Sequence, residues 1–253
     1  MDRSVLPVEA GPARTHRSPL RRRLVPAAAG LALLVALALC GVFRRPWFQG
    51  NLGIVDAGRV IRSAQPTTRL PEWIRTHQLR AILNLRGGSP ADWWYTAEVR
   101  AAEAGHVAFY DLPLSATRRP SRRELLRLID TLNSCPYPLL IHCKSGADRT
   151  GLVTAIYLMI QRGQSPERAK QAFALEHGHI PLGGTEHLHE PIDEYAAWLA
   201  ARRLPHTPER FRDWVKSHYE PSDCSPDPPR LQPGPRPRRS APGTRGPAGQ
   251  AEP

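Results

Sequence analysis

The sequence of 253 residues contains few cysteines, and its four show no Cys-x-x-Cys spacing. A disulfide framework is therefore not indicated. The basic residues lack the interleaved aromatic pattern of a nucleic-acid-binding module, so no nucleic-acid partner is expected. The net charge of +12 comes mostly from the ends of the chain, because residues 1–46 carry eight Arg against Asp2 and Glu9. The high pI is thus weak evidence for a polyanionic partner of the central region.

The last segment, 221–253, almost lacks large apolar side chains. It holds ten Pro and four Gly among its 33 residues. Such a composition cannot bury a core, so the sequence predicts a disordered tail. Residues 1–23 are polar, basic and without periodicity, and they are predicted to form a disordered arm.

Charged residues are absent from 24–43, which are mainly apolar. Twenty helical residues at about 1.5 Å each can cross a hydrocarbon core of roughly 30 Å. The preferred interpretation is a single-pass membrane anchor, with a buried soluble helix and a signal peptide cleaved near 36–38 as alternatives. Six Arg precede the segment and four follow it, which favours an inside N-terminus and an extracytoplasmic domain over a cytoplasmic one.

The stretch from Leu139 to Gly151 organises the rest of the chain. It reads Leu-Leu-Ile-His-Cys-Lys-Ser-Gly-Ala-Asp-Arg-Thr-Gly. Its apolar start predicts a buried strand, and the apolar run that follows it predicts a buried helix. A loop between a strand and a helix N-terminus points several backbone N–H groups into one concavity, which suits an anion.

The residue types in this loop indicate covalent phosphoryl transfer. Cys143 lies where backbone dipoles and cations favour a thiolate. Arg149 can hold two phosphoryl oxygens through its planar guanidinium, and Thr150 adds a hydroxyl near the sulfur. A thiolate that attacks phosphorus forms a thiophosphate, while the loop amides and Arg149 bind the transferring oxygens.

This loop resembles the signature loop of the cysteine-dependent protein tyrosine and dual-specificity phosphatases. Segments 62–66, 82–87 and 113–116 are similar to bacterial members of the small dual-specificity branch. The resemblance implies a catalytic domain over 47–220, with Cys143 as nucleophile, Arg149 as phosphate clamp, Thr150 easing thiolate departure and His142 orienting Cys143. Phosphate binding is expected from the loop residues Lys144, Ser145, Gly146, Ala147, Asp148 and Arg149.

The leaving group also needs a proton. The family uses an Asp on a loop about thirty residues before the Cys, and Asp111 fits that place. Its later role would be general base for the water that attacks the thiophosphate. Asp148 is the second candidate acid, although we expect it rather to brace the loop or a neighbouring Arg. Arg118 and Arg119 either meet an acidic substrate or belong to a solvated loop.

Lys144 directly follows the nucleophile. A basic residue there is common in phosphatases of inositol phosphates and phosphoinositides, and it also occurs in protein phosphatases. The expected substrate is a phosphorylated protein, with an inositol phosphate or lipid as the alternative. Segment 177–189 contains four His, which we interpret as a polar rim of the cleft, so no metal and no cofactor are expected.

Two other functions use the same residues. A catalytically dead phosphate-binding module would keep Arg149 and the loop but lack a working acid. A sulfur transferase with a similar loop would fit Thr150-Gly151 and Asp111 poorly.

The remaining pattern alternates strands and helices. Strands or hairpins are predicted at 54–63, 81–85 and 106–110, and helices at 69–77, 93–104, 122–132, 165–178, 190–203 and 207–218. The helix 93–104 is predicted to place Trp94, Ala97 and Ala101 on one side, and Ser121 with Glu124 to form a capping box. The fold class is therefore α/β, with a central, mostly parallel sheet flanked by helices and the catalytic loop at the carboxyl end of a central strand.

Overall fold

The computed structural model describes residues 32–41 and 49–221. Its strands form one five-stranded sheet with the order β1-β2-β5-β3-β4. Their bounds are β1 Gly53–Asp56, β2 Val60–Ser63, β3 Ala81–Asn84, β4 Ala108–Asp111 and β5 Leu139–His142. The β1–β2 pair is antiparallel and all other pairs are parallel. The predicted hairpin and the mostly parallel sheet are confirmed.

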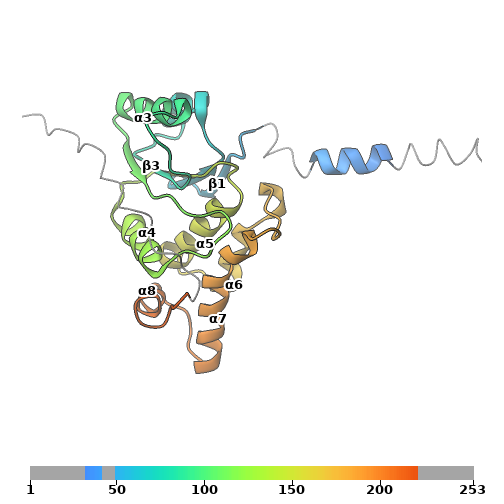
Figure 1. Cartoon of the computed structure of the whole chain (residues 1–253), viewed down its shortest axis with the longest axis vertical. Helices are drawn as coiled ribbons and strands as arrows, with labels where there is room; N and C mark the ends of the chain where they lie inside the picture. Colours follow the sequence, from blue (N-terminus) through green and yellow to red (C-terminus); the bar gives the residue numbers. More distant parts are fainter. Residues whose placement is uncertain (1–31, 42–48, 222–253) are drawn as a thin grey trace, which may run out of the picture.

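Helices cover both faces of this sheet (Figure 1). They are α2 Leu70–Thr76, α3 Trp93–Ala104, α4 Arg122–Ser134, α5 Asp148–Arg162, α6 Pro166–Ala169, α7 Glu190–Arg202 and α8 Pro208–Ser217. Short 3₁₀ helices are η1 Thr67–Arg69, η2 Lys170–Ala172, η3 Leu175–His177 and η4 Thr185–Leu188.

The central strand β5 shows how the layers are built. Successive side chains of a strand point to opposite faces. Leu139 and Ile141 pack in one core with α4, α5, α7 and α8, whereas Leu140 packs in a second core with α2 and α3. All four residues of β5 are buried. The strand that feeds the catalytic loop is therefore held from both sides.

Local sequence signals account for several helix ends. The hydroxyl of Ser121 accepts a hydrogen bond from the Glu124 N–H and the Glu124 carboxylate accepts one from the Ser121 N–H, so the predicted capping box is confirmed. The helix α5 ends at Gly163 in the left-handed conformation.

The prediction of one helix over 165–178 is wrong. The chain forms α6, then η2, and leaves helical geometry at Phe173, whose φ is −85° and ψ is 62°. The ring of Phe173 packs against Gly151 and the imidazoles of His179 and His189. This packing replaces the helix that local propensity favours.

The helix α3 buries a different face from the side that carries Trp94, Ala97 and Ala101. The buried residues of α3 are Glu98 and Ala102, while Ala97 is exposed. The helix turns toward the sheet because the Glu98 carboxylate lies against a buried imidazole described below.

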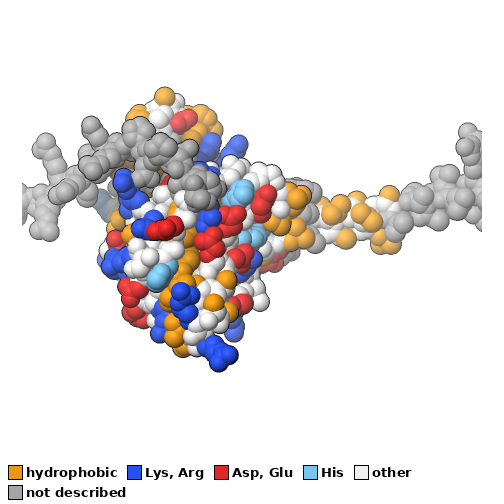
Figure 2. All heavy atoms as spheres, turned by 60° about the horizontal axis from the view of Figure 1, so that its bottom comes forward, with side chains coloured by type: hydrophobic (Ala, Val, Ile, Leu, Met, Phe, Trp, Pro, Cys, Tyr) orange, Lys and Arg blue, Asp and Glu red, His pale blue; other side chains and the backbone are white. Residues whose placement is uncertain are grey.

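The predicted anchor 24–43 lies only partly within the described residues. Residues 32–41 are helical and expose apolar side chains (Figure 2). Within 32–41 and 49–221, no helix combines the length and apolar character that a membrane crossing needs. The predicted arm 1–23 and nearly all of the predicted tail 221–253 lie outside the described residues.

Candidate active site

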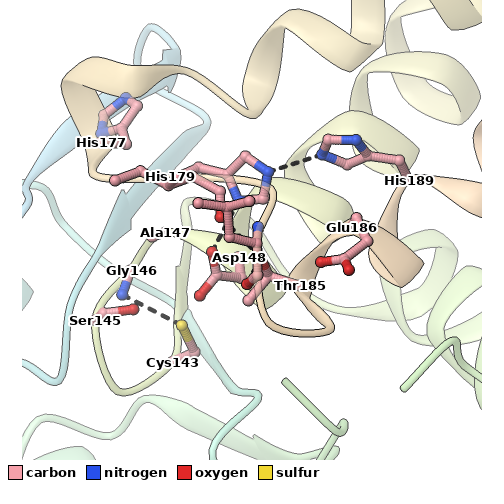
Figure 3. Close-up of polar contacts among 12 residues, drawn as sticks. Cys143, Ser145, Gly146, Ala147, Asp148, His177, His179, Thr185, Glu186 and His189 are labelled. Carbon is pink, nitrogen blue, oxygen red and sulfur yellow. Dashed lines mark hydrogen bonds and ion pairs between the residues drawn. The ribbon is translucent and has the colours of Figure 1, made fainter. Parts of the chain in front are cut away.

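The loop between β5 and α5 carries the predicted nucleophile. Cys143 directly follows the buried strand and is 1% exposed. The backbone N–H of Gly146 points at the sulfur, with 3.2 Å between N and Sγ (Figure 3). An N–H donor in this place can stabilise negative charge that develops on the sulfur when it leaves phosphorus.

A buried arginine holds the loop carbonyls away from the sulfur. Arg62 of β2 donates from Nη2 to the carbonyl oxygens of Gly146 at 2.9 Å and Ala147 at 3.3 Å. It also donates from Nη1 to the carbonyl of Ala172 at 2.7 Å. With its carbonyls bound on the outside, the loop can turn its N–H groups inward, which an anion site requires.

Gly146 is sterically required at its position. Its φ is +73°, in the left-handed region, and a Cβ there would lie 2.5 Å from the backbone of Ser63 and Ala64. Any other residue would push the loop away from β2.

Asn51 ties the loop to the segment after α6. Its Nδ2 donates to the carbonyls of Ser145 and His177, both at 2.8 Å, and its Oδ1 lies 2.9 Å from Nδ1 of His177. Asn51 is fully buried. The position of the loop thus depends on a contact between residues that are more than ninety positions apart in sequence.

The guanidinium group of Arg149 is hydrogen-bonded through Nη1 but not through Nε. Its Nη1 donates to the carbonyls of Leu85 and Leu114 at 3.3 Å each. Its Nε is buried and has no hydrogen-bond partner among the described residues, and the same is true of the hydroxyl of Thr150. Buried polar groups in proteins nearly always have partners, so these two donors are free to bind an anionic ligand.

His142 precedes the nucleophile and is completely buried. Its Nε2 lies 2.6 Å from Oε1 of Glu98, also completely buried. Gln65 donates to the other carboxylate oxygen of Glu98 at 2.6 Å. The imidazole is thus fixed against α3, which supports the predicted orienting role.

The predicted acid, Asp111, lies at the end of β4. Its Oδ2 accepts from the hydroxyl of Tyr95 at 2.9 Å and its Oδ1 from Nδ2 of Asn84 at 3.1 Å. Burial raises the pKa of this carboxyl, while the Tyr95 hydrogen bond opposes the rise. A raised pKa keeps more of the group protonated, as an acid requires.

Asp148, at the start of α5, was expected to brace the loop or a neighbouring Arg, and its carboxylate contacts a histidine. Its Oδ1 lies 2.7 Å from Nδ1 of His179, and Nε2 of His179 lies 2.8 Å from Nε2 of His189 (Figure 3). The segment predicted as a polar rim of the cleft therefore binds the loop through Asp148.

The remaining loop residues differ in exposure. Lys144 and Ser145 are exposed, whereas Ala147 is buried. The predicted contact of Arg118 and Arg119 with substrate is not supported, since both side chains bind carboxylates of the domain itself. Arg118 pairs with Glu124, and Arg119, 8% exposed, pairs with Glu190 and Glu194.

No group of three or more His, Cys, Asp or Glu side chains within 32–41 and 49–221 is arranged to hold a metal ion. The chemistry of Cys143 and Arg149 requires none.

Sequence reasoning missed the supporting roles of Asn51, Arg62 and Glu98. Arg62 and Asn51 are polar residues in or beside apolar strands, and Glu98 falls on the inner face of α3. A polar residue at a position where the period predicts an apolar one is the signal that could have identified them.

The sequence is similar to that of a known phosphatase family. Residues 50–184 match the family model "DSP-PTPase phosphatase fused to NAD+ Kinase". The dual specificity protein phosphatase TpbA of Pseudomonas aeruginosa is 28% identical over 175 residues, which cover 64% of this chain and 75% of TpbA.

Two solved structures also align with the chain. The core catalytic domain of the PP-IP phosphatase SIW14 from S. cerevisiae, in complex with citrate, aligns with a TM-score of 0.47 and 18% identity, over 62% of this chain and 96% of that one. PTPMT1 in complex with PI(5)P aligns with a TM-score of 0.44 and 19% identity, over 60% of this chain and 99% of that one. Because the family model covers more than half of the sequence, the chain belongs to the dual-specificity and protein tyrosine phosphatase (DSP-PTPase) family.

Proposed function

We propose that the protein is a phosphomonoester hydrolase that works through a cysteinyl-phosphate intermediate, as a protein tyrosine or dual-specificity phosphatase. The observation that carries the proposal is the pair of unsatisfied buried donors, Arg149 Nε and the Thr150 hydroxyl, in the second and third residues of α5, directly after the Cys143 loop. The carboxyl of Asp111, whose pKa burial raises, supports turnover over a binding-only role, because a binding module would lack a working acid.

The chemistry has two steps. The Cys143 thiolate attacks phosphorus, the bond to the leaving oxygen breaks, and Asp111 gives that oxygen a proton. Water then attacks the thiophosphate, its proton goes to the Asp111 carboxylate, the P–S bond breaks, and the thiolate returns. Arg149 binds two equatorial oxygens in both steps, and the Thr150 hydroxyl stabilises the departing sulfur.

An inositol phosphate or phosphoinositide is the second candidate substrate. Lys144 is exposed beside the nucleophile, where its ammonium group can meet a further phosphate. A protein substrate is favoured because the curated relative, TpbA, is a dual specificity protein phosphatase.

The test is hydrolysis of 4-nitrophenyl phosphate by the full chain in the presence of a chelator. Cys143→Ser should abolish turnover. Arg149→Lys should lower kcat by about 10²-fold or more, because a point charge cannot replace the two-oxygen clamp. Turnover by Cys143→Ser, or a near wild-type kcat of Arg149→Lys, would contradict the proposed chemistry.

A panel of phosphotyrosine and phosphoserine peptides, inositol phosphates and phosphoinositides then separates the substrate classes. The highest kcat/KM on a phosphopeptide supports the protein phosphatase assignment, and the highest value on an inositol derivative supports the alternative. Phosphopeptide binding without any turnover would indicate a binding module.

A further inference from the structure

A groove lies between α7 and α8, the two helices at the lower end of the domain in Figure 1. It has a volume of about 350 Å³, and its lining includes the aromatic rings of Trp198, Trp214 and His218. The ring centroids of Trp198 and His218 are 5.2 Å apart. None of the residues that line the groove belongs to the catalytic loop, so the proposed chemistry does not account for it.

Two carboxylates line the same groove. Glu209 and Asp213 are four positions apart on α8, so their side chains are neighbours on one face of the helix. Both residues are exposed, and neither forms an ion pair within 32–41 and 49–221. Like charges at this spacing repel each other, so this face of α8 favours a partner that brings positive charge.

Two arginines near the groove are bound to other groups of the domain. Arg210, which also lines the groove, donates from Nη1 to the carbonyl of Pro205. The guanidinium of Arg202 lies over the ring of Trp198, with Cζ 4.7 Å from the centroid. Neither arginine neutralises the two carboxylates, and the second contact shows that the ring of Trp198 can bind a guanidinium group.

The segment 233–239 of the same chain has chemistry that matches this groove. It reads Pro-Gly-Pro-Arg-Pro-Arg-Arg. A segment so rich in Pro favours the polyproline II conformation, which has three residues per turn. That period places Arg236 and Arg239 on one edge, as a pair of acidic side chains requires. Polyproline II segments commonly bind in grooves that are lined by aromatic rings.

The chain between the groove and this segment is long enough to allow contact. His218 lines the groove, and the structure describes the chain up to residue 221. The twelve residues from 221 to 233 span up to about 37 Å at 3.1 Å each. The helix α8, with ten residues, is only about 15 Å long. A short connection of this kind also raises the effective concentration of the segment at the groove.

We propose that the groove between α7 and α8 binds the chain's own segment 233–239. The Arg side chains of the segment pair with Glu209 and Asp213, and its Pro rings pack against Trp198 and His218. The composition of 221–253 cannot bury a core of its own, but a preformed surface can bind such a segment. The inference goes beyond the proposed function and does not depend on it, because no catalytic residue takes part.

A fluorescent peptide of residues 231–240 tests whether the groove is occupied in the full chain. The tail variant Arg236→Glu, Arg238→Glu and Arg239→Glu should bind this peptide at least about tenfold more tightly than the wild-type chain, since its own segment no longer competes. The matched control changes Arg14, Arg17 and Arg21 of the N-terminal arm to Glu, which alters the net charge by the same amount. It should bind the peptide as weakly as wild type. Fluorescence anisotropy gives both affinities.

Reversal of the charges on the groove identifies the site. Added to the tail variant, Glu209→Arg with Asp213→Arg should weaken binding of the peptide at least about tenfold. Placed in the wild-type chain, the same two changes should create binding of a peptide whose three last Arg are replaced by Glu. Glu209 and Asp213 are exposed, so the thermal unfolding of these variants should match wild type.

A peptide with Pro233→Ala, Pro235→Ala and Pro237→Ala keeps all charges and tests the contact with the aromatic rings. It should bind the tail variant at least about fivefold more weakly than the unchanged peptide. Equal affinity of these two peptides would overturn the inference, because binding would then be electrostatic only.

Three further outcomes would also overturn it. The first is equal peptide affinity of the wild-type chain and the tail variant, which means that the segment does not occupy the groove. The second is peptide binding that survives the charge reversal of Glu209 and Asp213, which places the binding elsewhere. The third is a dimer in sedimentation of the wild-type chain that the tail variant lacks, because the groove would then bind the segment of a second copy.

Discussion

The carboxyl group of Asp111 has surroundings that act on its protonation in opposite directions. Burial raises its pKa, and the hydrogen bond from the Tyr95 hydroxyl lowers it. Burial, and next the contact with Asp111, raise the pKa of Tyr95 to about 12, so Tyr95 remains a donor at all working pH values. The balance of these effects sets the pH at which an acid at this place loses its proton.

Tyr95→Phe should therefore move the alkaline limb of kcat/KM to higher pH. Removal of the donor takes away the largest effect that opposes burial, so the pKa of Asp111 rises further and the protonated form persists to higher pH. The pH profile of phenyl phosphate hydrolysis measures this directly. A shift to lower pH would remove Asp111 from the acid role.

Asp111→Asn provides the complementary measurement. It should slow phenyl phosphate, whose leaving group needs a proton, by about 10²-fold or more, and 4-nitrophenyl phosphate far less. Equal losses on both substrates would mean that Asp111 supports the fold of the site without transferring a proton.

At the scale of elements, the close approach of the catalytic loop to β2 defines the site. The positive φ of Gly146 and its contact with the backbone at Ser63 and Ala64 leave no room for a side chain. Arg62, from the same strand, binds the loop carbonyls. The strand β2, which is far from the catalytic loop in sequence, thus decides the direction of the loop's N–H groups.

Gly146→Ala should lower kcat at least tenfold and reduce the free energy of unfolding by about 1–3 kcal/mol. Gly163→Ala, at the end of α5, is a matched control, because its φ is +61° but nothing lies within 4 Å of the added Cβ. Thermal unfolding and kcat of both variants make the comparison. Full activity of Gly146→Ala would show that the loop tolerates displacement from β2.

The length of β5 keeps Cys135 and Cys143 too far apart to form a disulfide in the folded protein. Cys135 ends α4 before this strand, and Cys143 follows its last residue. Four strand residues span about 13 Å, whereas a disulfide needs Cα atoms within about 7 Å. Burial also raises the pKa of the Cys135 thiol, which makes it unreactive.

Peroxide should therefore inactivate the enzyme through Cys143, and Cys135→Ser should not change the fraction of activity that a thiol reductant restores. Activity measured after peroxide and after dithiothreitol, in both proteins, tests this. Irreversible loss confined to Cys135→Ser would show that the two cysteines meet after local unfolding.

At the scale of the whole molecule, the surplus of positive charge is not concentrated on the catalytic domain. Figure 2 shows Lys and Arg interspersed with Asp and Glu on the face that it presents. The helix 32–41 carries exposed apolar side chains and extends to one side of the domain in Figure 2. We propose that residues 24–43 anchor the protein in a membrane, with the catalytic domain outside the cytoplasm.

Protease added to intact spheroplasts should then degrade the domain without lysis. The protein is first localised by sedimentation of membranes and extraction with detergent. A domain that is cleaved only after lysis would place it on the cytoplasmic side, and a protein that never sediments with membranes would contradict the anchor.

The sequence by itself determined the α/β class, the hairpin, the capping box and the stretch with Cys143 and Arg149, because each depends on residues close together in the chain. Only the tertiary structure brought Asn51, Arg62 and Glu98 to the catalytic loop, broke the helix predicted over 165–178, and joined Asp148 to His179. These features depend on packing between elements that are distant in sequence, such as Phe173 on Gly151, and packing of that kind overrides local propensity.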